Sequence, residues 1–154
     1  MKNLLIILLF IPLLNFSQTE EIQEVPFSLI DIPPTMPGCE DKDIFIPILT
    51  EYNESLSSKM SQCTSEKITK FVQRKFNTDL AGDLGLSGIQ RINIIFKIDK
   101  NGDVVGVRAR ANHPALIEEA KRVISMLPKM KPGYQKGKVV IVQYSLPIIF
   151  RVQD

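Results

Sequence analysis

The sequence of residues 89–111 is IQRINIIFKIDKNGDVVGVRARA, and this stretch decides the fold. In its first half, apolar side chains occupy every second position, which is the period of a half-buried strand. These side chains are Ile92, Ile94, Phe96 and Ile98. Asn101-Gly102 follows, and both residues accept the positive φ of a hairpin turn. A return strand is then lined by Val105, Val107, Ala109 and Ala111. The stretch therefore predicts an antiparallel β-hairpin.

The turn also imitates the start of a calcium-binding loop, with Asp99, Asn101 and Asp103 at alternate positions. An EF-hand loop needs glycine at its sixth position and glutamate at its twelfth. Counted from Asp99, those positions hold Val104 and Arg110. We therefore interpret the stretch as a turn and predict no metal site.

Helices are expected on both sides of the hairpin. The first spans Thr64–Phe76, with Thr64 or Ser65 as its N-cap. The second begins at His113-Pro114, because proline fits the first helical position, and it ends before Pro128. A weaker helical pattern lies within Asp43–Met60. The apolar stripes of the two stronger helices are Ile68, Phe71, Val72 and Phe76, and Leu116, Ile117, Ala120, Val123, Ile124 and Leu127.

A long final strand is predicted for Val139–Val152. One face of it carries Val140, Val142, Tyr144, Leu146, Ile148, Phe150 and Val152. If this strand pairs beside the first hairpin strand, the crossover through the second helix is right-handed, as chirality favours. The predicted fold class is α+β: a two-layer ββαβ domain whose three-stranded antiparallel sheet has the order 2-1-3 and is covered by helices on one face.

Residues 1–17 have the three-part layout of a secretory signal peptide: Lys2, the apolar run Leu4–Leu14, and Ser17 before a cleavage point. At ~1.5 Å per residue the apolar run covers about half of a ~30 Å hydrocarbon core. Cleavage would leave 18 basic and 17 acidic side chains, a balance that argues against a nucleic-acid surface. Residues 18–36 are expected to form an extended linker, and residues 37–154 the domain.

The two cysteines, Cys39 and Cys63, are expected to form a disulfide, because an exported chain folds in an oxidising compartment. The bridge would close a helical insert, residues 39–63, onto a core formed by residues 64–152. A zinc site that includes His113 is the alternative. Structural zinc takes four ligands at compact spacing, which favours the disulfide.

From Phe96 to Val152 the chain resembles the C-terminal domain of TonB, the energy transducer of the Gram-negative envelope. The shared features are a strand that ends in D-x-x-G at Asp99–Gly102, a β return, a helix with E-x-A-K at Glu118–Lys121, a Pro-Gly connection and a terminal strand. Residues 36–40, MPGCE, also resemble the start of one branch of these domains, with Met36 where an aromatic residue is usual. The resemblance covers about Pro37 to Val152.

The resemblance implies a non-enzymatic periplasmic binding module without a cofactor. Its last strand would pair with the TonB box, an extended peptide of an outer-membrane transporter or other envelope protein. The expected peptide-binding edge consists of Val140, Val142, Gln143, Tyr144, Ser145, Leu146, Ile148 and Phe150. Self-pairing of this strand into a homodimer is another possibility. The alternative function is a short TonB-type energy transducer, held in the inner membrane by an uncleaved N-terminus and supporting transmembrane transport.

An enzyme is the rival class of function. Catalysis needs a base beside a nucleophile or a pair of tuned carboxylates. His113, the single histidine, has no Ser or Cys neighbour in sequence, and Glu118 and Glu119 point in different directions from one helix. The sequence therefore predicts a protein that is not an enzyme.

Overall fold

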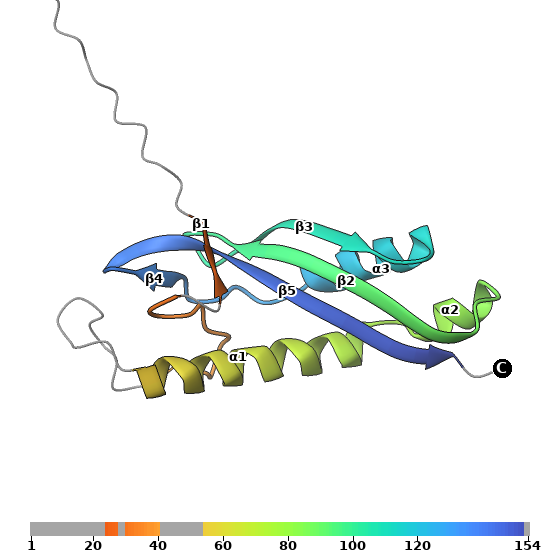
Figure 1. Cartoon of the computed structure of the whole chain (residues 1–154), viewed down its shortest axis with the longest axis horizontal. Coiled ribbons are helices and arrows are strands. Elements are labelled where there is room, and N and C mark those ends of the chain that lie inside the picture. The colour runs from red at the N-terminus through yellow and green to blue at the C-terminus, as the bar shows by residue number, and fades with distance from the viewer. Residues whose placement is uncertain (1–23, 28–29, 41–53, 153–154) are drawn as a thin grey trace, which may run out of the picture.

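The computed structural model describes residues 24–27, 30–40 and 54–152. The expected signal peptide, the first part of the expected linker and residues 41–53 of the expected insert lie outside these ranges. The elements in chain order (Figure 1) are β1 (Glu24–Pro26), α1 (Glu54–Lys75), α2 (Asp79–Asp83), β2 (Gly88–Ile98), β3 (Val104–Arg110), α3 (Pro114–Ser125), β4 (Gly133–Gln135) and β5 (Lys138–Val152).

The sheet contains five strands in the order β1-β5-β2-β3, and β4 also pairs with β5. The α+β class is confirmed, and the three predicted strands are neighbours in the expected order. The prediction of a three-stranded sheet is wrong, because β1 pairs parallel with Ile141–Gln143 and β4 pairs with Lys138–Val140. Each additional strand has three residues, which is too short to show a period of two.

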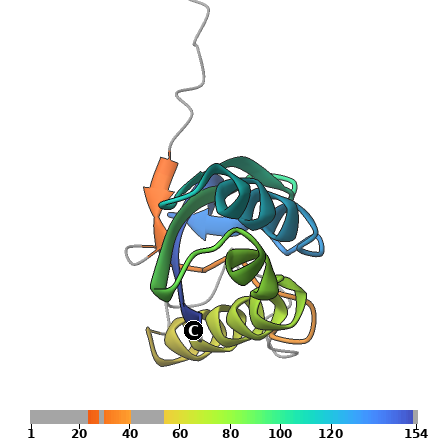
Figure 2. The same cartoon turned by 90° about the vertical axis from the view of Figure 1, so that its right-hand side faces the viewer.

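Both long helices lie on the same side of the strands (Figure 2). The side chains of β2 at positions 92, 94, 96 and 98 are fully buried beneath them. Leu116, Ala120, Val123 and Ile124 of α3 are also fully buried, and Ile68 and Val72 of α1 complete the same core. The apolar faces that the sequence predicted for β2, α1 and α3 therefore pack into one hydrophobic core. Burial of their apolar area stabilises the fold.

The hairpin between β2 and β3 turns at the predicted place, but of Asn101 and Gly102, which were both expected to accept positive φ, only Gly102 has it. Gly102 has φ of +86°, and a Cβ atom there would lie 1.7 Å from the carbonyl oxygen of Met130. The Asp99 carboxylate accepts hydrogen bonds from the N–H groups of Asn101 and Asp103. This side chain thus stabilises a turn, and the described residues contain no group of three candidate metal ligands.

The return strand differs from the prediction at Val105. A register shift opposite Ile95–Lys97 places Val105 across from Lys97, and Gly106 has φ of +61°. Val105 is exposed, whereas Val104, Val107 and Ala109 pack against the core. The bulge reverses the alternation for one residue, and a strict period of two could not show it.

The expected N-cap at Thr64 or Ser65 is also wrong. The helix α1 begins ten residues earlier, at Glu54, so that the described end of the expected insert and the Thr64 helix are one continuous element. Thr64 is fully buried within it, and its hydroxyl accepts a hydrogen bond from the N–H of Met36 at 3.2 Å. A threonine can cap a helix or bond a distant backbone group, and only the fold selects between these roles.

The start of α3 agrees with the sequence. His113 is the N-cap, and its Nδ1 accepts a hydrogen bond from the N–H of Ala115 at 3.2 Å. Pro114 occupies the first turn, where a missing N–H costs nothing. The single histidine thus has a structural role at this helix start.

The disulfide between Cys39 and Cys63 is confirmed, with a Cα–Cα distance of 5.7 Å. It joins the turn at Pro37–Gly38 to the middle of α1. The Nζ of Lys67 donates a second link, a hydrogen bond of 2.6 Å to the carbonyl oxygen of Pro37. Covalent and polar contacts together hold the N-terminal segment against α1.

Replacing both cysteines, as Cys39→Ser and Cys63→Ser, should lower the free energy of unfolding by about 3.5 kcal/mol, because the open chain gains loop entropy. Urea denaturation followed by circular dichroism measures this difference. The oxidised wild type and the same protein under reducing conditions provide the matched pair. A loss below about 1 kcal/mol would contradict the proposed constraint on the unfolded chain.

A polar contact joins the end of α1 to α3. Glu119 accepts hydrogen bonds of 2.7 Å from the Arg122 guanidinium and of 2.9 Å from the N–H of Asn77. Arg122 also donates to the carbonyl oxygen of Lys75 at 3.1 Å. The hydrogen bond from Arg122 holds the pKa of Glu119 below its ordinary value, although desolvation opposes this shift.

The variant Glu119→Gln should melt at a lower temperature than wild type at neutral pH. Because the folded pKa is depressed, the carboxylate stabilises fully above the unfolded value of about 4.3, and this stabilisation is lost as pH falls through the folded pKa. The difference in Tm should therefore shrink on acidification. Glu118→Gln is the control, because Glu118 bonds only Lys121 on the same exposed helix face. A difference in Tm that does not depend on pH would contradict this assignment.

Candidate functional site

The longest strand, β5, has two edges with different neighbours. One edge pairs with β2 without interruption, from Val142 opposite Ile98 to Val152 opposite Gly88. The other edge is covered by β1 along Ile141–Gln143. Beyond Gln143, no strand in the described part of the chain pairs with this second edge. We call residues Ser145–Val152 on this side the open edge.

The residues expected to bind a peptide are therefore divided between two environments. Val140 and Val142 are buried in the core, and Gln143 lies opposite Pro26 of β1. Tyr144 is buried at the boundary. The open edge contains Ser145, Leu146, Ile148 and Phe150. An edge open along the whole strand was expected, but β1 of the same chain pairs with it at Ile141–Gln143.

Tyr144 is enclosed by two aromatic rings. The ring of Phe27, just after β1, lies with its centroid 4.1 Å from that of Tyr144, and Phe96 stacks on the other side at 5.3 Å. Burial raises the pKa of the Tyr144 hydroxyl, and within the described part of the chain that hydroxyl has no hydrogen-bond partner. The N-terminal segment thus covers the end of the open edge with apolar contacts.

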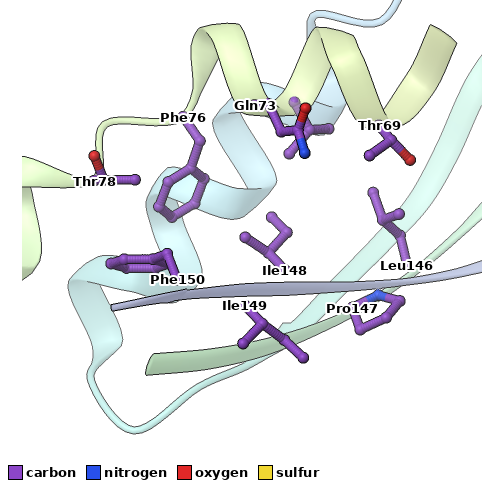
Figure 3. A pocket seen from close by; sticks show the side chains of 10 residues that line it. Thr69, Gln73, Phe76, Thr78, Leu146, Pro147, Ile148, Ile149 and Phe150 are labelled. Carbon is purple, nitrogen blue, oxygen red and sulfur yellow. The ribbon is translucent and has the colours of Figure 1, made fainter. Parts of the chain in front are cut away.

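A groove of about 320 Å³ runs between α1 and the open edge (Figure 3). Leu146, Ile148 and Phe150 point from β5 toward α1, whereas Pro147 and Ile149 point away. The opposite wall comes from α1 and the residues after it: Thr69, Val72, Gln73, Phe76 and Thr78. Phe76 and Phe150 approach each other across one end, with ring centroids 5.7 Å apart.

The backbone of the open edge can be assigned from Pro147. Proline lacks an N–H and occurs in sheets where its nitrogen faces an unpaired side. Because β5 pairs with β2 in one continuous register, backbone groups alternate between the two edges. The N–H groups of Ser145, Ile149 and Arg151 therefore face the open edge with those residues' carbonyls. An added strand would find three donors there and a missing donor at Pro147.

Sequence reasoning did not find the α1 wall of this groove. Phe71, Val72 and Phe76 were recognised as an apolar face, but nothing in the sequence indicates that Phe76 contacts the last strand. Gln73 belongs to no sequence pattern that predicts a place in the groove. Val25 and Phe27, which close the other end of the edge, lie in a short apolar stretch that could have suggested contact with the domain.

The residues that line the groove are uncharged, and basic side chains lie on the neighbouring surface of α1. A second hollow lies along α1 on the side of the N-terminal segment and is lined by Met36, Lys67, Lys70, Phe71, Gln73 and Arg74. Gln73 lines both hollows. A strand docked at the open edge would therefore lie near basic side chains of α1, which favours acidic residues in the guest.

Comparison with models of known protein families gives a match that includes the strands around this site. The family model for the Gram-negative bacterial TonB protein C-terminal matches residues 81–152. Residues 81–152 belong to the TonB C-terminal domain family. The match runs from α2 to the last residue of β5 and so contains the hairpin, α3 and the open edge. No curated protein matches the chain.

TonB C-terminal domains are non-enzymatic protein-interaction domains of the cell envelope, and they interact with outer-membrane proteins. The α1 wall of the groove precedes the matched residues. Among the described helices, none has both the length and the apolar character needed to cross a membrane.

Replacing Phe27 tests how the N-terminal segment closes the edge. Phe27→Ala should lower the free energy of unfolding by roughly 2 kcal/mol, because the half-buried ring loses its contact with Tyr144. Amide exchange at Gln143 should accelerate, since its N–H faces β1. Urea denaturation and hydrogen exchange measure the two effects, with Phe27→Leu as the control. Unchanged exchange at Gln143 would show that β1 stays in place without the ring.

Proposed function

We propose that this TonB C-terminal domain binds an extended peptide segment of an outer-membrane protein as an added strand on the open edge of β5. The observation that carries the proposal is an unpaired strand edge beside an apolar groove. An unpaired edge exposes backbone donors and acceptors that a guest strand can satisfy. The proposed site of action is the periplasm, after removal of the N-terminal signal peptide.

The guest would gain affinity from backbone hydrogen bonds and selectivity from side chains. Alternate side chains of a strand point to opposite faces, so every second residue of the guest would enter the groove between β5 and α1. Leu146, Ile148 and Phe150 would contact apolar guest residues there. Gln73, at the α1 wall, offers an amide to a polar guest atom.

The extent of the site follows from its boundaries. The guest cannot pair beyond Gln143 without displacing β1, which Phe27 and the Glu24–Lys97 ion pair hold in place. An eight-residue edge, Ser145–Val152, matches the length of an ordinary strand. The site thus selects a short extended segment rather than a folded surface.

Titration of isotope-labelled protein with N-terminal peptides of outer-membrane transporters tests the proposal. We expect amide shifts at Ser145, Ile148 and Ile149 and at Gln73 across the groove, with α3 unaffected. Shifts confined to other elements, or none, would contradict peptide binding here. Shifts at the same amides on raising protein concentration without peptide would indicate a second copy as the occupant instead.

A proline substitution separates backbone pairing from side-chain contact. Ile149→Pro removes one donor from the open edge and leaves the pairing with β2 intact, so peptide affinity should fall about tenfold. Ile149→Ala is the matched control, because it keeps the N–H and loses only an exposed side chain. Its affinity should stay within about threefold of wild type. Equal losses in the two variants would contradict strand addition.

A further inference from the structure

The face of the sheet turned away from α1 and α3 carries an arginine cluster. Four exposed arginines point to this outer face, because their neighbours along each strand are packed against the core. They are Arg91 of β2, Arg108 and Arg110 of β3, and Arg151 of β5. The cluster lies outside the groove and is absent from the proposed function.

Strand register places these arginines close together. Arg110 lies opposite Asn93, two residues from Arg91 on the same strand, and Arg108 lies opposite Ile95. Neighbouring strands are about 5 Å apart and residues two apart on one strand about 7 Å. Arg110 is therefore a close neighbour of both Arg91 and Arg108, whereas Arg91 and Arg108 lie on either side of it and four positions apart along β2.

The described part of the chain does not neutralise the four guanidinium groups. Within residues 24–27, 30–40 and 54–152, none of them forms an ion pair or a side-chain hydrogen bond. Several acidic side chains form ion pairs with other basic residues: Glu24 pairs with Lys97, Glu119 with Arg122 and Asp103 with Lys129. Like charges at neighbouring sheet positions destabilise a fold, so an unneutralised cluster is suited to an external anion.

Exposed apolar side chains alternate with the cluster. Arg91 lies opposite Ile149 and Arg151 lies opposite Ile89. Ile149 is 58% exposed and Ile89 is 49% exposed. Neither hollow beside α1 includes an arginine of this face. Guanidinium groups spread over three strands, with isoleucines between them, fit a broad anionic surface better than a single acidic side chain.

We propose that the outer face of the sheet binds the surface of an anionic phospholipid membrane. Arginine pairs well with phosphate oxygens, since its planar fork donates two parallel hydrogen bonds. Ile89 and Ile149 would enter the boundary between headgroups and acyl chains, as apolar residues of peripheral proteins do. The membrane would lie across the sheet while the open edge at the side of β5 remains available.

Co-sedimentation with vesicles tests this inference in the full protein. Vesicles that contain phosphatidylglycerol should bind the protein, and vesicles of phosphatidylcholine alone measure any contribution of the apolar N-terminal residues. The triple variant Arg91→Gln/Arg108→Gln/Arg110→Gln should bind the anionic vesicles about 100-fold more weakly, because each basic side chain near such a surface contributes about fivefold. Added salt should weaken wild-type binding.

The matched control removes the same number of charges from α1, as Lys59→Gln/Lys70→Gln/Lys75→Gln, and should keep at least a third of the wild-type affinity. Equal losses in the two triple variants would overturn the proposal, because net charge alone would then explain binding. Equal binding to neutral and anionic vesicles would also overturn it. Binding to poly-L-glutamate but not to vesicles would assign the face to an acidic protein instead. The peptide titration monitors the open edge independently, so failure here leaves the peptide site untouched.

Discussion

The continuous antiparallel pairing of β2 with β5 is the constraint on which the rest of the structure depends. It connects Gly88–Ile98 with Val142–Val152 in one register without a shift. A slip by one residue would turn Val142 and Tyr144 out of the core, so burial on one face fixes the pairing. That register also determines which backbone groups of β5 face β2 and which remain open. The groove and the open edge are consequences of it, and so are the positions of Arg91 and Arg151 on the outer face.

The N-terminal segment decides how much of β5 can accept a guest. Val25 and Phe27 cover the sheet near Tyr144, and the backbone of Ile32 and Thr35 exchanges hydrogen bonds with Tyr134 and Lys131. The disulfide then ties the end of this segment to α1. The C-terminal half of α1 lines the groove beside the open edge. One segment thus closes the first part of the strand and supports the groove beside the second part.

Charge is separated on this small domain. Ion pairs within the described residues involve helices, turns, β1 and Lys97 of β2. In the same part of the chain, the arginines of the outer face have no carboxylate partner. The peptide proposal uses the strand edge and the helical side of β5. The membrane proposal uses the opposite face. Because alternate residues of one strand point to opposite faces, β5 can contribute to both surfaces without one blocking the other.

The sequence by itself determined the elements whose signals are local. Asn101-Gly102 specified the hairpin turn, Pro114 the start of α3, and the alternation from Val140 to Val152 the buried face of β5. The order of these elements was enough to recognise the TonB C-terminal family. The cysteine pair could also be predicted, since the expected signal peptide implies an oxidising compartment and two cysteines allow a single intramolecular bridge.

Only the tertiary structure decided which part of the last strand is free. Three residues of β1 have no measurable period, and their parallel pairing with Ile141–Gln143 connects positions more than a hundred residues apart. The groove forms because Phe76, just after α1, lies close to Phe150 of β5. The helical pattern around Phe76 and the strand pattern around Phe150 each indicated only an ordinary core residue. Local patterns report which side chains avoid water; the partner that covers each one depends on how distant segments pack.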